Sequence, residues 1–125
     1  MPNIEQQYAR IVYELVAGFQ ENYASEHPDW IDQYGSMALR LPILVHNAGL
    51  VQALAYVEDR GKDSHKELLN HLAEVLGYAN RSELLAESRI VDFKSYQYLT
   101  RKTNIALSWF KRFAHSVLGV EEGAE

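Results

Sequence analysis

The sequence predicts an all-α protein, a compact single-domain bundle of five or six helices. Apolar residues recur at spacings of three and four along most of the chain, which is the period of an amphipathic helix. The chain has 125 residues, 47% of them hydrophobic, which is enough for one core without cross-links. It has no cysteine, which excludes disulfides and thiolate chemistry. We expect a single α-helical domain over residues 1–120 and a flexible acidic tail over residues 121–125.

The first half of the chain predicts three helices. The first lies within residues 4–23, and its apolar stripe contains Ile4, Tyr8, Ile11, Val12, Leu15, Val16, Phe19 and Tyr23. Residues 24–29 form a turn from which Asp29 caps a helix over about 30–46, with a kink near Pro42. A break at 47–49 follows because Asn and Gly adopt the left-handed conformation cheaply, and a third helix reaches about residue 60. The alternative is one long helix kinked at Pro42.

Asn47 is unusual because it projects among apolar residues on a helical wheel. A buried amide without a hydrogen bond costs about 1–3 kcal/mol, so we expect Asn47 to be a structural residue that caps this break.

Capping signals define the second half. In SHKE, Ser64 and Glu67 form a capping box that begins the fourth helix, and Gly77 ends it. Its apolar face contains Leu68, Leu69, Leu72, Val75 and Leu76. Asn80 and Glu83 repeat the pattern before a short fifth helix, and a final helix runs from about 93 to 118. No strand pattern competes with these helices.

The final helix has an unusual distribution of charge. The whole chain has a net charge of -5, but residues 93–120 hold five Lys and Arg residues and no acid. The apolar arc of this helix contains Leu99, Ala106, Phe110, Phe113, Ala114 and Val117. The opposite side carries Lys94, Arg101, Ser108, Arg112 and His115, flanked by Asn104 and Lys111, with Lys102 at another angle and Tyr98 and Trp109 alongside. Such a stripe can follow a phosphate backbone, and the alternative is an ordinary solvated helix face.

Two other patterns suggest chemistry, and the sequence favours neither. Arg40 and His46 have the R-x5-H spacing that resembles the motif of small helical ribonucleases of the HEPN superfamily, in which imidazole transfers protons and guanidinium stabilises phosphorane charge. The simpler interpretation is a surface cation and a histidine at a helix end. Glu67, His71 and Glu74 share a helical face, but a di-iron bundle needs a second Glu-x-x-His motif. We therefore expect no catalytic residue, no metal site and no cofactor.

The most apolar stretch, residues 37–57, is interrupted by Arg40, Pro42, His46, Asn47 and Gln52, so we expect it to form core and not a membrane span. The first ten residues do not resemble a secretory signal. These observations predict a cytoplasmic protein with no membrane partner.

Two segments carry a family resemblance. YGSMALRLPILVHNAGLVQALAYV at 34–57 and YLTRKTNIALSWFKRFA at 98–114 resemble, in order and separation, two signatures of the small-subunit family of type III-B CRISPR–Cas (Cmr) effector complexes. The resemblance implies a subunit without catalytic activity. Such subunits stack into a minor filament with neighbouring copies, beside the backbone subunits, and line the channel around the crRNA–target RNA duplex.

The second signature includes Lys111 and Arg112, which the resemblance assigns to RNA backbone contact. Charge geometry adds Arg40, Lys94, Arg101 and Lys102 as RNA-binding candidates. The excess of acid outside the last helix departs from this picture. Pro42 and Gly49 are expected to bend the chain so that two apolar helices pack against the last one. The alternatives are the helical ribonuclease, the analogous type III-A small subunit and a free-standing interaction module.

Overall fold

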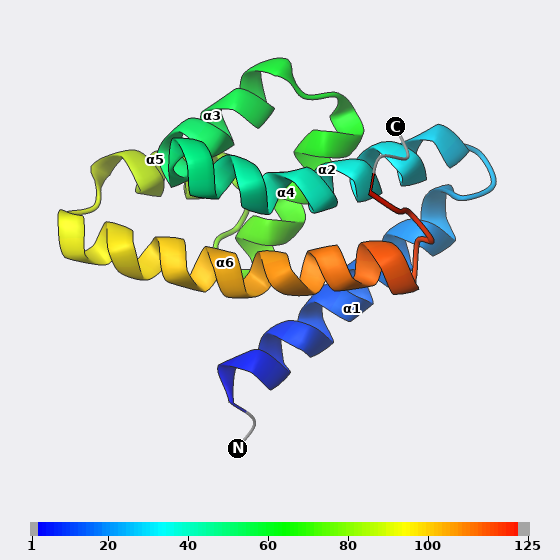
Figure 1. The fold of residues 1–125 in the computed structure, drawn as a ribbon, viewed down its shortest axis with the longest axis horizontal. Coiled ribbons are helices and arrows are strands. Elements are labelled where there is room, and N and C mark those ends of the chain that lie inside the picture. Colours follow the sequence, from blue (N-terminus) through cyan, green and yellow to red (C-terminus); the bar gives the residue numbers. More distant parts are fainter. Residues whose placement is uncertain (1–2, 123–125) are drawn as a thin grey trace.

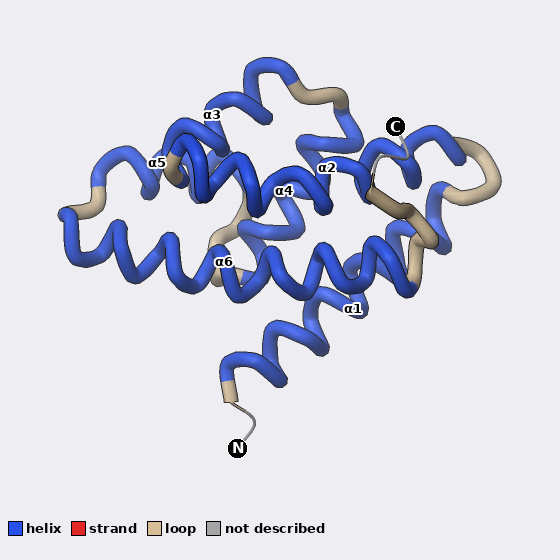
Figure 2. The backbone as a smooth tube through the Cα atoms, viewed as in Figure 1, coloured by secondary structure: helices blue, strands red, loops and turns tan. Residues whose placement is uncertain are grey.

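The computed structural model describes residues 3–122, which form six helices and no strand (Figures 1 and 2). The helices are α1 (Ile4–Tyr23), α2 (Pro28–Ala48), α3 (Leu50–Arg60), α4 (Asp63–Val75), α5 (Arg81–Ile90) and α6 (Phe93–Ser116). The predicted all-α fold is confirmed. Most of the predicted acidic tail, residues 123–125, lies outside the described residues. Within residues 3–122, no helix combines the length and apolar character that a membrane span requires.

Helix α6 extends along one side of the bundle, where α1 and α2 make its most extensive contacts (Figure 1). Helix α4 packs on α2, and α5 packs on α3 and α4. The large side chains that are completely buried include Tyr34, Phe110, Leu41, Leu50, Leu54, Leu68, Leu69, Leu72, Leu84 and Leu107. Helix α6 therefore has one side in the core and the other in solvent.

Two of the predicted helix starts are wrong in detail. Helix α2 begins at Pro28, which needs no N–H partner in the first turn, and Asp29 makes no capping hydrogen bond. Helix α4 begins at Asp63, one residue before the predicted cap. Ser64 is buried, and its hydroxyl donates to Gln33 Oε1 at 2.7 Å. The tertiary contact to α2 thus uses the hydroxyl that the sequence pattern assigned to the cap.

The other helix boundaries follow the sequence more closely. Asn80 Oδ1 accepts from the Glu83 N–H at 3.0 Å and caps α5 as predicted. After α4, Gly77 has φ 94° and the Tyr78 N–H donates to the Ala73 carbonyl at 2.8 Å, which is the geometry of a Schellman motif. Gly77 therefore ends the helix in the left-handed conformation that the sequence predicts.

The break between α2 and α3 lies at Gly49, where φ is 88°. Helix α2 is continuous through Pro42 to Ala48. The prediction that Asn47 is buried and caps the break is wrong: Asn47 is exposed, and no side chain caps the start of α3. The wheel misplaced it because its neighbour on the same side, Ile43, is also 58% exposed. The Val51 N–H instead donates to the Tyr96 hydroxyl at 3.1 Å.

Only one of the two helices expected to pack against the last helix does so extensively. Helix α2 packs along α6, whereas α3 lies mainly against α2 and α5 and reaches α6 through Tyr96. The bend at Gly49 therefore directs α3 toward α5.

The segment after α6 turns back toward α2 (Figure 1). Gly119 has φ 70°, and Val120 is buried against Gly35 of α2. A Cβ atom on Gly35 would lie 2.5 Å from Val120 Cγ2, so α2 has a notch that only glycine leaves open. This contact holds the residues that follow, Glu121 and Glu122, near the C-terminal half of α6.

Candidate nucleic-acid interface

The orientation of α6 is fixed by contacts at both of its halves. Asp92 caps the helix by accepting from the Ser95 N–H at 2.8 Å, and this hydrogen bond lowers the pKa of the Asp92 carboxyl. Near the other end, the Trp109 indole N–H donates to Glu5 Oε1 of α1 at 2.8 Å. The core-facing side buries Leu99, Thr103, Ala106, Leu107, Phe110 and Ala114. The predicted inward stripe is confirmed, with Phe113 and Val117 partly buried at its margin.

We call the opposite side of α6 the basic face and define it as Lys94, Arg101, Ser108, Arg112 and His115, all of which are exposed. Within residues 3–122, neither Lys94, Arg101 nor Arg112 forms an ion pair with a carboxylate. Three cations therefore remain available on one side of a rigid helix.

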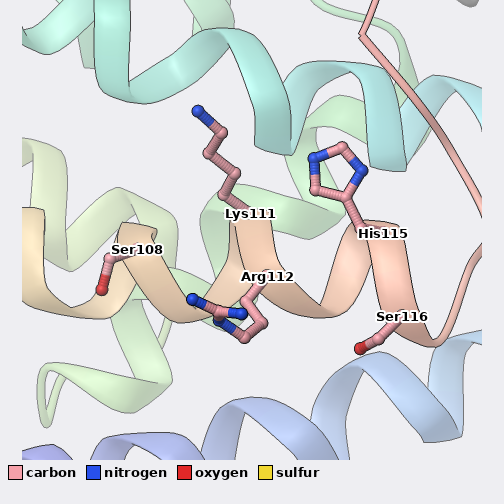
Figure 3. Close-up of a pocket in the computed structure, with 5 residues that line it drawn as sticks. All are labelled: Ser108, Lys111, Arg112, His115 and Ser116. Atoms are coloured by element: carbon pink, nitrogen blue, oxygen red, sulfur yellow. The ribbon is translucent and has the colours of Figure 1, made fainter.

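Two hollows lie along the basic face. The N-terminal hollow, of about 380 Å³, is lined by Lys94, Ser95, Gln97, Tyr98 and Arg101. The C-terminal hollow, of about 580 Å³, is lined by Ser108, Lys111, Arg112, His115 and Ser116. In Figure 3, Lys111 and His115 extend toward α2, whereas Arg112 and Ser116 lie on the side of α1. Both hollows combine cations with hydroxyl or amide groups, a chemistry that suits phosphate.

Two further candidate cations are engaged within the protein. Lys111 Nζ lies 3.4 Å from Glu122 Oε1, with both side chains substantially exposed. Lys102 Nζ lies 4.7 Å from the centre of the Tyr98 ring, a cation–π contact. The sequence predicted a helix face without acids, but packing brings Glu5 and Glu122 to α6 from the two ends of the chain. An exposed pair such as Lys111–Glu122 contributes only about 0–1 kcal/mol, so a phosphate could replace the carboxylate.

Arg40 and His46 do not form a site within one chain. Arg40 is exposed on α2, lines neither hollow and makes an interaction within the protein. His46 is exposed in the last turn of α2. Six residues of helix turn the two side chains about 120° apart, so they point in different directions.

A buried polar pair lies on the other side of the bundle. Tyr34 is fully buried, and its hydroxyl is hydrogen-bonded to His71 Nδ1 at 2.7 Å. Burial lowers the pKa of His71, and Glu67 and Glu74 oppose that shift. The Tyr34 ring stacks on Phe19 with centroids 4.2 Å apart. No group of three potential metal ligands occurs in residues 3–122, so His71 is best explained as a partner for Tyr34.

A long helix that presents unpaired cations on the outside of an α-helical bundle defines a class of protein that can bind a polyanion. The family model described as "CRISPR-associated protein (Cas_Cmr5)" matches residues 4–117. The chain belongs to the Cmr5 family, which confirms the resemblance to the small-subunit family of type III-B effector complexes.

Two relatives from Thermus thermophilus support this assignment. The protein named CRISPR system Cmr subunit Cmr5 is 50% identical over 86 residues, which cover 69% of this chain and 75% of that protein. The crystal structure of a CRISPR-associated Cmr5 family protein superposes with a TM-score of 0.83 at 43% identity, and the match covers 94% of this chain and 98% of the other.

Proposed function

We propose that this protein is a non-catalytic subunit of a type III-B CRISPR–Cas (Cmr) effector complex in the cytoplasm, as the name of the Thermus relative suggests. It stacks into the minor filament with neighbouring copies, beside the backbone subunits. The basic face lines the channel that holds the crRNA–target RNA duplex. The observation that carries this proposal is the exposure of Lys94, Arg101 and Arg112 on one side of α6 without a carboxylate partner in residues 3–122.

The proposal assigns RNA backbone contact to the two hollows and to Lys111 after its carboxylate partner is displaced. Each phosphate that a cation neutralises releases counterions, so binding of this kind weakens as salt rises. The separate directions of Arg40 and His46 favour a binding role over the helical ribonuclease. Arg40 keeps a place in the proposal as an exposed cation of α2 outside the two hollows.

The test is charge reversal in the assembled complex. We expect Lys111→Glu with Arg112→Glu to weaken target-RNA capture and to reduce the slope of log affinity against log salt by about two. Arg60→Glu with Lys62→Glu is the matched control, because it changes the net charge equally on exposed residues remote from α6. Capture that is equally strong in both variants, with both complexes assembled, would refute the role of the basic face.

A further inference from the structure

The two hollows differ in one respect, an exposed aromatic ring. Tyr98 lines the N-terminal hollow and is 55% exposed, whereas no aromatic residue lines the C-terminal hollow. Trp109, the other aromatic residue near the basic face, stacks on Phe113 with centroids 5.7 Å apart and donates its N–H to Glu5. Trp109 is therefore committed to the fold, and Tyr98 is the ring that a ligand can reach.

The Tyr98 ring is held in place by its neighbours. Lys102, one helical turn later, places its ammonium 4.7 Å from the ring centre. From α1, the buried Tyr8 lies close enough for Tyr98 to contribute, after burial, to the raised pKa of the Tyr8 hydroxyl. The ring is thus positioned between its own helix and α1, and it also borders the hollow that contains Lys94 and Arg101. A ring that is already ordered loses little conformational entropy when a ligand stacks on it.

We propose that the N-terminal hollow binds one unpaired RNA nucleotide, with its base stacked on Tyr98 and its flanking phosphates on Lys94 and Arg101. The proposal rests on the RNA-binding role proposed for the basic face and names the part of the RNA that this hollow takes. A base in a duplex offers its faces to its neighbours, so only an unpaired or displaced base can stack on a side chain. The C-terminal hollow, which has cations but no ring, contacts backbone without such a preference.

The experiment measures binding of the full chain by fluorescence anisotropy with three labelled probes of equal length: oligouridylate, an oligomer of abasic ribose phosphates and a blunt RNA duplex. Stacking of one base is worth about 1–3 kcal/mol, so we expect Tyr98→Leu to weaken oligouridylate binding about five-fold or more. Tyr98→Phe, which keeps the ring, should stay within about two-fold of the wild type. Both variants should bind the abasic oligomer and the duplex as the wild type does, because phosphate contacts alone hold those probes.

Tyr56→Leu is the matched control, since Tyr56 is 50% exposed on α3 and lies outside both hollows. Unchanged oligouridylate binding by Tyr98→Leu, or an equal loss on the abasic probe, would overturn the stacking inference and leave the RNA-binding proposal intact. Wild-type protein that binds none of the probes, or binding unaffected by Lys94→Gln with Arg101→Gln, would instead refute the basic face as an RNA surface. Circular dichroism confirms that each variant is folded.

Discussion

Replacing Tyr34 by Phe would remove one hydroxyl from the interior and leave the aromatic ring where it is. Tyr34 is 1% exposed, and its hydroxyl lies 2.7 Å from His71 Nδ1. The stack on Phe19 needs only the ring and should survive the change. The loss is therefore that of one hydrogen bond, with a ring nitrogen of a partly buried histidine left unpaired. Leaving such a group unsatisfied costs about 1–3 kcal/mol, and the partial access of His71 to water places this case near about 1–2 kcal/mol.

The assay is urea and thermal unfolding followed by circular dichroism at about pH 8, where His71 is neutral. A loss of about 1–2 kcal/mol in the free energy of unfolding corresponds to a fall of about 4–8 °C in Tm for a domain of this size. Tyr56→Phe, which changes an exposed tyrosine, should alter stability by less than about 0.5 kcal/mol. A Tyr34→Phe variant as stable as the Tyr56→Phe control would show that the hydroxyl contributes nothing, and the reasoning from the buried pair would be wrong.

Two further predictions concern stability. Burial lowers the pKa of His71 in the folded state below its ordinary value of 6.5, so the unfolded state binds more protons in acid. The free energy of unfolding should therefore fall as the pH drops from about 6.5 through the folded pKa, and His71→Gln should flatten that part of the pH profile measured by urea denaturation; an unchanged profile would contradict it. Gly35→Ala should destabilise the fold by about 1–3 kcal/mol, because the new Cβ would lie 2.5 Å from Val120 Cγ2. Adding Val120→Ala should make the cost of that substitution smaller, and a cost that stays the same would exclude the clash as its cause.

The division of α6 into an inner and an outer side could be predicted because helical period alone determines which residues share a face. Leu99, Phe110 and Ala114 are buried, and Lys94 and Arg112 are exposed, as the wheel places them. The errors arose where a contact between distant segments decides the outcome. Ser64 bonds to Gln33 on another helix, and no local pattern reveals that partner.

The surroundings of the candidate site were predicted less well for the same reason. Glu5 and Glu122 reach α6 from opposite ends of the chain, so counting charges along the helix missed them. The contact between Lys102 and Tyr98 could have been found, because residues four apart on a helix lie one above the other. The pairing of Tyr34 with His71 joins α2 to α4 and has no signal in either segment alone.

The two anchors of α6 have a consequence for the length of what it can bind. Tyr96 accepts a hydrogen bond from α3 and Trp109 donates one to α1, so neighbours on different helices prevent α6 from rolling about its axis. Lys94 and Arg112 are therefore kept about 27 Å apart along a straight helix. The helix is in effect a fixed ruler: an oligonucleotide shorter than this span can occupy one hollow or the other, and a longer one is needed to occupy both.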